Sequence, residues 1–124
     1  MPPRSALLLI AHGSRRPEAN ADLEFVAASL RERGTYDIVV PSYLELAEPD
    51  IATGGERCVE QGATRVTMVP YFLSAGVHVR DDLEASRLAL AGRFAGVEFR
   101  LAGPLGRHPL LLEIVEQRAA ECTG

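Results

Sequence analysis

Short apolar runs alternate four times with longer amphipathic stretches, and this alternation constrains the fold more than any other feature of the sequence. The runs that we expect to be strands cover residues 6–11, 36–44, 65–71 and 97–102. The stretches that we expect to be helices cover residues 17–34, 50–61, 79–94 and 109–121. Strands that alternate with helices form parallel sheets through right-handed crossovers. We therefore predict a three-layer α/β fold, with a four-stranded parallel sheet and helices on both faces.

Pro41 indicates the order of the strands. It lies within the second expected strand, and because proline has no N–H to donate, this strand belongs at an edge of the sheet. The economical order is then 2-1-3-4, in which the first and third strands are neighbours and their helices leave to opposite faces. Such a switch point is where open α/β sheets bind their ligands.

Two glycines, Gly54 and Gly55, lie inside the second expected helix. Each costs about 1 kcal/mol relative to alanine in a helix interior, so we expect this helix to be irregular.

The length and composition indicate an ordinary globular chain. With 124 residues, 47% of them hydrophobic and 24% charged, we expect one domain spanning residues 1–124. No apolar run is long enough to cross a membrane and no signal peptide is recognisable, so we expect a cytoplasmic protein that does not bind membranes. The net charge of −4 argues against nucleic acid as a partner. Two widely spaced cysteines, Cys58 and Cys122, are expected to be reduced.

Three side chains with useful chemistry follow the first three expected strands. His12 follows the first strand, Glu45 the second and His78 the third. Because the carboxyl ends of parallel strands share one edge of the sheet, these residues should lie near one another. Imidazole and carboxylate together suit cobalt, nickel, iron or zinc, and imidazole can also accept protons near neutral pH. From spacing alone, each residue could equally be a hydrogen-bonding or solvated loop residue.

Arg15, Arg16 and Arg80 lie beside the two histidines, and a positive patch on an acidic protein suits a small anionic ligand. Phosphate chemistry is disfavoured, because the chain has neither a P-loop lysine nor a G-x-G-x-x-G motif. Ala11 also occupies the position where histidine phosphatases need an arginine. The third histidine, His108, precedes a proline at an expected helix start, and we expect a structural role for it.

Four motifs then occur in a recognisable order. They are LIAHGSR at residues 9–15, YLELAEP at 43–49, VPYFLSAGVH at 69–78 followed by Asp82, and GPLG at 103–106. Together they resemble the sirohydrochlorin chelatases of the CbiX/SirB type, over about residues 7 to 118. The resemblance implies a chelatase-like, flavodoxin-like domain. It also implies insertion of a divalent metal, classically cobalt, into sirohydrochlorin in tetrapyrrole biosynthesis, without an organic cofactor.

The resemblance also implies roles for individual residues. His12 and His78 match the paired family histidines that hold the incoming metal and take up pyrrole protons. Glu45 matches the acidic position of the Leu-Glu-Leu motif, and we give it a lesser role as metal ligand or proton relay. We expect substrate contacts from six further residues, of which the arginines are inferred from charge alone: Ser14, Arg15, Arg16, Ser74, Gly76 and Arg80.

Long members of this family carry two α/β halves in one chain, whereas this chain has one. We therefore expect a homodimer, with the macrocycle in a cleft between or beside two subunits. Cobalt, nickel and ferrous iron all suit the same ligands. Three alternatives stay open: a carrier of metal or tetrapyrrole without turnover, a phosphatase, and a purely structural or interaction protein.

Overall fold

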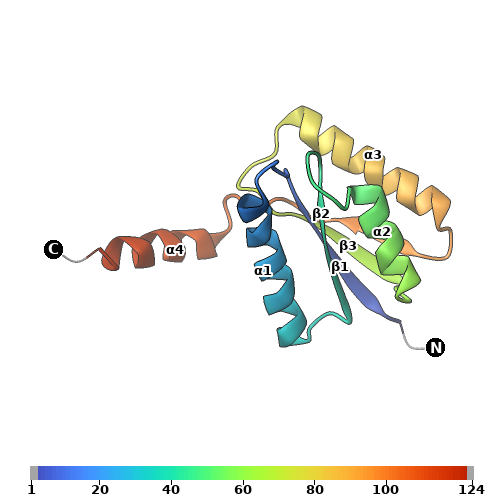
Figure 1. The fold of residues 1–124 in the computed structure, drawn as a ribbon, viewed down its shortest axis with the longest axis horizontal. Helices are drawn as coiled ribbons and strands as arrows, with labels where there is room; N and C mark the ends of the chain where they lie inside the picture. The colour runs from blue at the N-terminus through green and yellow to red at the C-terminus, as the bar shows by residue number, and fades with distance from the viewer. Residues whose placement is uncertain (1–2, 123–124) are drawn as a thin grey trace.

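The computed structural model describes residues 3–122 and contains four strands that alternate with four helices (Figure 1). The elements are β1 Ser5–Ala11, α1 Pro17–Arg33, β2 Ile38–Tyr43, α2 Ile51–Glu60, β3 Arg65–Pro70, α3 Val77–Arg93, β4 Glu98–Leu101 and α4 Pro109–Ala120. All strand pairs are parallel and the sheet order is β2-β1-β3-β4. The predicted fold class and strand order are therefore confirmed.

β1 is the central strand and fixes the register of its neighbours. Leu8 of β1 lies opposite Val40 of β2 and Met68 of β3. Pro41 lies on β2, which pairs only with β1 among the described strands, so this proline does occupy an edge strand. Because strands on both sides and side-chain layers on both faces cover β1, its continuous apolar run is buried.

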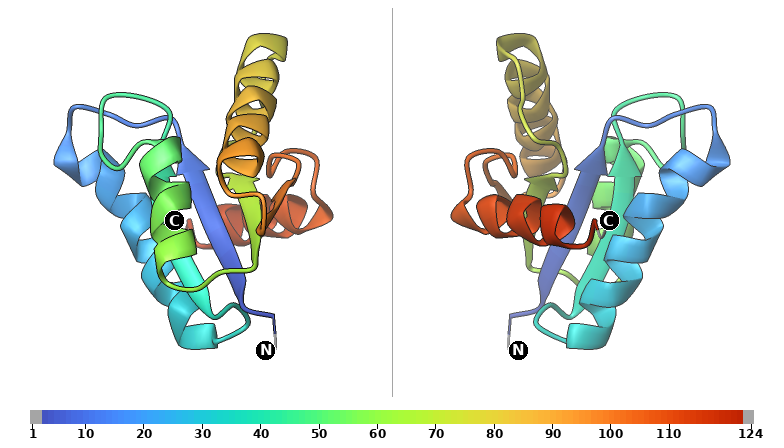
Figure 2. Two further views of the ribbon diagram at one scale, coloured as in Figure 1. Left: turned by 90° about the vertical axis from the view of Figure 1, so that its right-hand side faces the viewer. Right: turned by 90° about the vertical axis from the view of Figure 1, so that its left-hand side faces the viewer.

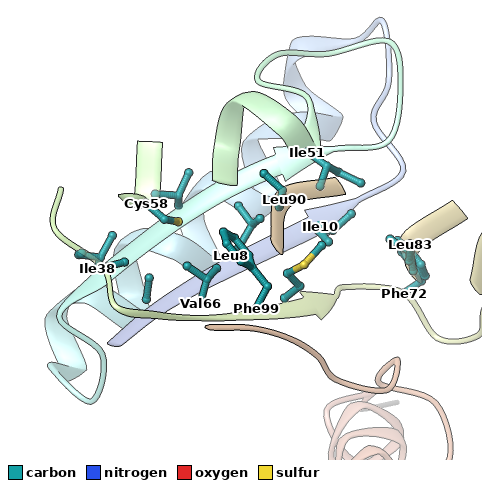
Figure 3. Close-up of a cluster of buried hydrophobic side chains, with 14 residues drawn as sticks. Leu8, Ile10, Ile38, Ile51, Cys58, Val66, Phe72, Leu83, Leu90 and Phe99 are labelled. Carbon is teal, nitrogen blue, oxygen red and sulfur yellow. The ribbon is translucent and has the colours of Figure 1, made fainter. Parts of the chain in front are cut away.

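The helices cover the two faces of the sheet unequally. Leu7 and Leu9 of β1 point to one face and pack in a cluster with Leu23 of α1. Leu8 and Ile10 point to the other face and join a larger cluster, shown in Figure 3, that includes side chains of α2 and α3. The helices that follow β1 and β3 therefore leave to opposite faces, as predicted for a switch point between these strands.

Helix α2 is uninterrupted, so the irregularity expected from its glycine pair is not observed. A Cβ atom on Gly54 would lie 2.9 Å from the side chains of both Leu8 and Ser42, and one on Gly55 would lie 2.7 Å from Leu90. The two glycines thus allow α2 to approach the sheet and α3 closely. Asp50 caps the helix by accepting a hydrogen bond from the Thr53 N–H at 2.8 Å.

Helix α4 does not lie along the sheet. Figures 1 and 2 show it extending away from the body of the domain, and none of its residues is buried. Side chains of β4 alternate, with Phe99 in the cluster beneath α2 and α3, so Glu98 and Arg100 point to the opposite face. Like the other helices of residues 3–122, α4 is not long and apolar enough to cross a membrane.

Candidate active site

The loop that carries His12 is hydrogen-bonded to the loop that carries Glu45. The Leu44 N–H donates to the Ala11 carbonyl at 2.9 Å, and the Glu45 N–H donates to the His12 carbonyl at 3.1 Å. Gly13 has a φ of +94°, and a Cβ atom there would lie 1.8 Å from the Glu45 carbonyl oxygen. Only glycine fits this close approach. The backbones of His12 and Glu45 are therefore fixed side by side, while both side chains are exposed.

The end of β3 supports His12 from the other side. The Tyr71 N–H donates to the Ile10 carbonyl at 2.6 Å, which extends the sheet ladder beyond the last residue of β3. The Phe72 ring then stacks on the His12 imidazole, with centroids 4.4 Å apart and planes 28° from parallel. Phe72 is only 7% exposed and belongs to the same core cluster as Leu83 (Figure 3). A core side chain thus sets the position of an exposed imidazole.

Sequence reasoning did not assign Phe72 to the site. An aromatic residue just beyond a buried strand is usually part of the core, and nothing local indicates that its ring reaches the neighbouring strand's loop. The only available signal was that Phe72 lies within the motif that also carries His78.

His78 lies in the first turn of α3, because this helix begins at Val77 rather than at the expected residue 79. Its side chain is exposed, as are those of Ser74 and Arg80. Gly76 precedes the helix with φ −70° and ψ 170°, an extended conformation open to any residue, and a Cβ atom there would meet nothing within 4 Å. Gly76 is therefore not needed for the turn.

Ser14 has a structural role in the His12 loop. Its N–H donates to Asn20 Oδ1 at 2.9 Å, and Asn20 Nδ2 donates to the Ser14 carbonyl at 2.8 Å. The Ser14 hydroxyl accepts the Arg16 N–H at 3.1 Å. These bonds hold the exposed Arg15 and Arg16 just before α1. A substrate contact from Ser14 stays a prediction, and Asn20 is a positioning residue that sequence reasoning missed.

The fourth motif is fixed to the segment after β3. The Leu105 N–H donates to the Phe72 carbonyl at 2.9 Å, and a Cβ atom on Gly106 would lie 1.7 Å from the Leu73 carbonyl oxygen. His108 Nδ1 accepts the Leu110 N–H at 3.2 Å and caps α4, which confirms the structural role expected for it. A largely apolar groove of about 630 Å³ separates the segment after β3 from the start of α4.

Comparison with known proteins shows the family of this chain. A family model for CbiX matches residues 6–122. The chain belongs to the CbiX family. It is 40% identical over 116 residues to a chloroplastic sirohydrochlorin ferrochelatase of Arabidopsis thaliana, an alignment that covers 94% of this chain and 52% of that protein.

Two solved structures share the CbiX fold. One is a putative cobalamin biosynthesis CbiX protein from Marinobacter aquaeolei, with 34% identity, a TM-score of 0.81, and coverage of 94% of this chain and 95% of that one. The other is the sirohydrochlorin chelatase SirB from Bacillus subtilis subspecies spizizenii in complex with cobalt, with 29% identity and a TM-score of 0.86. The match covers 95% of this chain and 50% of the SirB chain. The CbiX chain thus spans about half the length of its long relatives.

The two histidines of the site follow neighbouring strands, His12 directly and His78 in the first turn of the next helix. His12 follows β1 and His78 follows β3, and the hydrogen bond from Tyr71 joins the two strand ends. Within residues 3–122, no group of three or more histidine, cysteine, aspartate or glutamate side chains lies close enough to hold a metal ion. The structure therefore does not assemble His12, Glu45 and His78 into a three-ligand set. It offers two exposed imidazoles, with a carboxylate on the loop next to one of them.

Proposed function

We propose that this chain is a sirohydrochlorin chelatase, which inserts a divalent metal into the macrocycle. The observation that carries the proposal is the placement of two exposed histidines in a chain of the CbiX family: His12 directly follows β1, and His78 lies in the first turn of α3, the helix that follows β3. Its relatives include proteins named sirohydrochlorin ferrochelatase and sirohydrochlorin cobaltochelatase.

The reaction sets the chemistry that the site must supply. One dication enters the macrocycle and two pyrrole N–H protons leave, so the charge of the macrocycle is unchanged. Insertion therefore needs a ligand that releases its metal and bases that accept protons near neutral pH. Neutral imidazole meets both needs, because it binds divalent first-row metals and titrates near neutrality. We assign both roles to the pair His12 and His78.

Glu45 takes the lesser role of proton relay or additional metal ligand. Its N–H is bonded to the His12 carbonyl, so its carboxylate is held on the adjacent loop. The substrate is a large, flat polyanion, and its peripheral carboxylates suit the exposed Arg15, Arg16 and Arg80. Ser14, Ser74 and Gly76 complete the proposed substrate contacts.

Cobalt is the metal we would test first, with nickel and ferrous iron as alternatives. Relatives are named for both cobalt and iron, and imidazole suits all three ions. No organic cofactor enters the proposed reaction. A single CbiX-type domain, a homodimer and a cytoplasmic location stay part of the proposal.

The test is the visible absorbance of sirohydrochlorin mixed with Co²⁺, Ni²⁺ or Fe²⁺, with and without the protein. We expect conversion faster than the spontaneous rate, and loss of this acceleration in His12→Ala and His78→Ala. Glu45→Gln should lower the rate partially. Glu60→Gln, which removes an exposed carboxylate at the far end of α2, is the matched control and should keep the rate.

A second series tests substrate contacts. Arg15→Gln and Arg80→Gln should raise KM for sirohydrochlorin, whereas Arg33→Gln at the far end of α1 should not. If the protein binds metal or sirohydrochlorin stoichiometrically but does not accelerate insertion of any of the three metals, it is a carrier rather than an enzyme.

A further inference from the structure

Leu46 is an exposed leucine in a backbone conformation that leucine rarely adopts. Its φ is +63°, in the left-handed region, and its side chain is 52% exposed. This conformation brings the Cβ atom close to the following carbonyl oxygen, so it is unfavourable for a bulky residue. Backbone outliers of this kind cluster at catalytic and ligand-binding sites. The conformation of Leu46 therefore needs an explanation other than the burial of its side chain.

The residues around Leu46 hold it in this conformation. The Tyr43 N–H donates to the Pro49 carbonyl at 2.9 Å, so the two ends of the loop are joined. Leu44 packs against the core cluster beneath α2 and α3, whereas Ala47 packs against the cluster beneath α1. Leu46 belongs to neither cluster. The loop is thus anchored on both sides of Leu46, and it presents this apolar side chain to solvent.

Leu46 also lies next to the His12 loop. The Glu45 N–H donates to the His12 carbonyl at 3.1 Å, and the Glu45 carbonyl oxygen lies against Gly13. Leu46 is the next residue of the chain. Figure 2 shows the loops after β1 and β2 together at the end of the sheet where α3 begins. A ligand bound between His12 and Glu45 would therefore lie within reach of the Leu46 side chain.

Other exposed apolar side chains gather at the same edge of the sheet. Outside α4, residues 3–122 carry six large apolar side chains that are exposed. Two of them, Phe25 and Leu88, lie within α1 and α3. The other four follow β2 or β3, and we call them the apolar rim: Leu46, Tyr71, Leu73 and Val77. Exposed apolar surface outside α4 is therefore concentrated at the edge that carries the histidines.

The apolar rim and the arginines form two kinds of surface around the site. Leu46 directly follows Glu45, and Val77 directly precedes His78. The exposed cations follow the two histidines in the sequence: Arg15, Arg16 and Arg80. A flat macrocycle has an apolar ring inside a charged periphery. The apolar side chains next to the chemical groups suit the ring, and the cations suit the carboxylates at its edge.

We propose that Leu46 is a specificity-determining residue, which contacts the apolar face of the tetrapyrrole ring while the arginines contact its carboxylates. The inference rests on the proposed function, because it assigns a binding role within that site. The arginines select only for negative charge, whereas an apolar contact selects for the ring itself. A small polyanion without a large ring would satisfy the arginines and leave Leu46 in water.

The first experiment measures the affinity of the full chain for sirohydrochlorin without metal, by fluorescence titration. Leu46→Asn keeps a side chain of similar size and tolerates the left-handed backbone, so its urea midpoint should not fall. We expect its Kd to rise about 10-fold, a change that the burial of one leucine side chain can supply. Leu46→Met keeps an apolar side chain and should bind like wild type. Leu88→Asn makes the same change on α3 and should also keep the wild-type Kd.

Three outcomes of this titration would overturn the inference. The first is a wild-type Kd in Leu46→Asn. The second is an equal rise of Kd in Leu88→Asn, which would show that any exposed leucine has the same effect. The third is a raised Kd in Leu46→Asn together with a lower urea midpoint, which would assign the leucine a structural role in its loop.

The second experiment separates apolar contacts from charged ones. The Kd is measured between about 0.05 and 0.5 M salt, because salt weakens contacts between charges and leaves an apolar contact nearly unchanged. We expect Leu46→Asn to raise the Kd by the same factor at every salt concentration, whereas Arg15→Gln should reduce the salt dependence. A salt dependence that falls in Leu46→Asn as it does in Arg15→Gln would show that the change displaces the arginines, and would overturn the inference.

Metal insertion is measured on the same proteins, so that the reaction and the inference can fail separately. Binding that depends on Leu46, without acceleration of insertion for any metal, would keep the inference and remove the reaction. Accelerated insertion with a Kd that does not depend on Leu46 would keep the reaction and remove the inference. A wild-type protein that does not bind sirohydrochlorin would remove both.

Discussion

Replacing Gly13 by alanine should damage both stability and activity, because this residue is where the His12 loop meets the Glu45 loop. Its φ of +94° is strained for an L-residue, at a cost of about 1–2 kcal/mol. The new Cβ atom would lie 1.8 Å from the Glu45 carbonyl oxygen, so the two loops would have to separate by more than about 1 Å. Separation weakens the hydrogen bond from the Glu45 N–H to the His12 carbonyl, which is worth about 0.5–1.5 kcal/mol. We expect a loss of about 2–3 kcal/mol in the free energy of unfolding.

The same displacement moves His12, and a shift of about 1 Å at a reacting group can lower a rate by about 100-fold. Urea unfolding measures the stability, and sirohydrochlorin absorbance with Co²⁺ measures the rate in folded protein. Gly92→Ala is the matched control: Gly92 lies within α3 and a Cβ atom there meets nothing within 4 Å. It should stabilise the protein by about 0.5–1 kcal/mol and keep the rate. Wild-type stability and rate in Gly13→Ala would show that the loops are not held together as we argue.

Two further changes test the support of His12 and the cap of α2. Phe72→Leu keeps an apolar side chain but removes the ring that stacks on the His12 imidazole, and an aromatic pair is worth about 0.5–1.5 kcal/mol. We therefore expect metal insertion to slow by about 2- to 10-fold, and Phe72→Tyr to restore most of the rate; equal rates for all three proteins would contradict a positioning role. Hydrogen bonding from Thr53 lowers the pKa of Asp50 in the folded protein, so the ionised carboxylate stabilises the fold above its unfolded pKa of about 3.9 and this contribution is lost as pH falls. Asp50→Ala should cost about 1 kcal/mol at pH 7, and urea titrations should show the difference from wild type shrinking below about pH 4; a difference that does not depend on pH would argue against the charged cap.

The strand order could be predicted because it depends on local rules. A proline inside a strand places that strand at an edge of the sheet, whatever the rest of the fold. Pro41 is indeed on the edge strand β2. Because the strands alternate with helices and the crossovers between them are right-handed, few topologies then remain. The position of His12 directly after β1 followed from the same rules, whereas His78 lies in the first turn of α3 rather than before that helix.

Features that depend on contacts between distant segments could not be predicted. By intrinsic propensity, Gly54 and Gly55 destabilise a helix. Their presence in α2 is explained only by its close packing against Leu8 and Leu90. The start of α3 shifted for a similar reason: Gly76 suggested a turn, but its backbone is extended and the helix begins immediately after it. Helix α4 has an ordinary helical pattern, and nothing in that pattern indicates that the preceding loop approaches the Leu73 carbonyl closely at Gly106.

The site combines fixed backbones with exposed side chains, and this combination links its activity to assembly. Main-chain bonds at Ala11 and Ile10 hold the loops in place, while the two imidazoles lie open at one sheet edge. An open edge admits a wide macrocycle but contacts only part of it, so affinity for sirohydrochlorin should depend on the second wall that the other subunit of the proposed homodimer would supply. In the proposed homodimer we therefore expect the KM for sirohydrochlorin to rise about 10-fold or more when dilution separates the subunits, since a loss of about 1.4 kcal/mol in binding has this effect. Raising the protein concentration until the subunits associate should lower the KM again. A KM that does not change with protein concentration would show that one sheet edge binds the macrocycle alone.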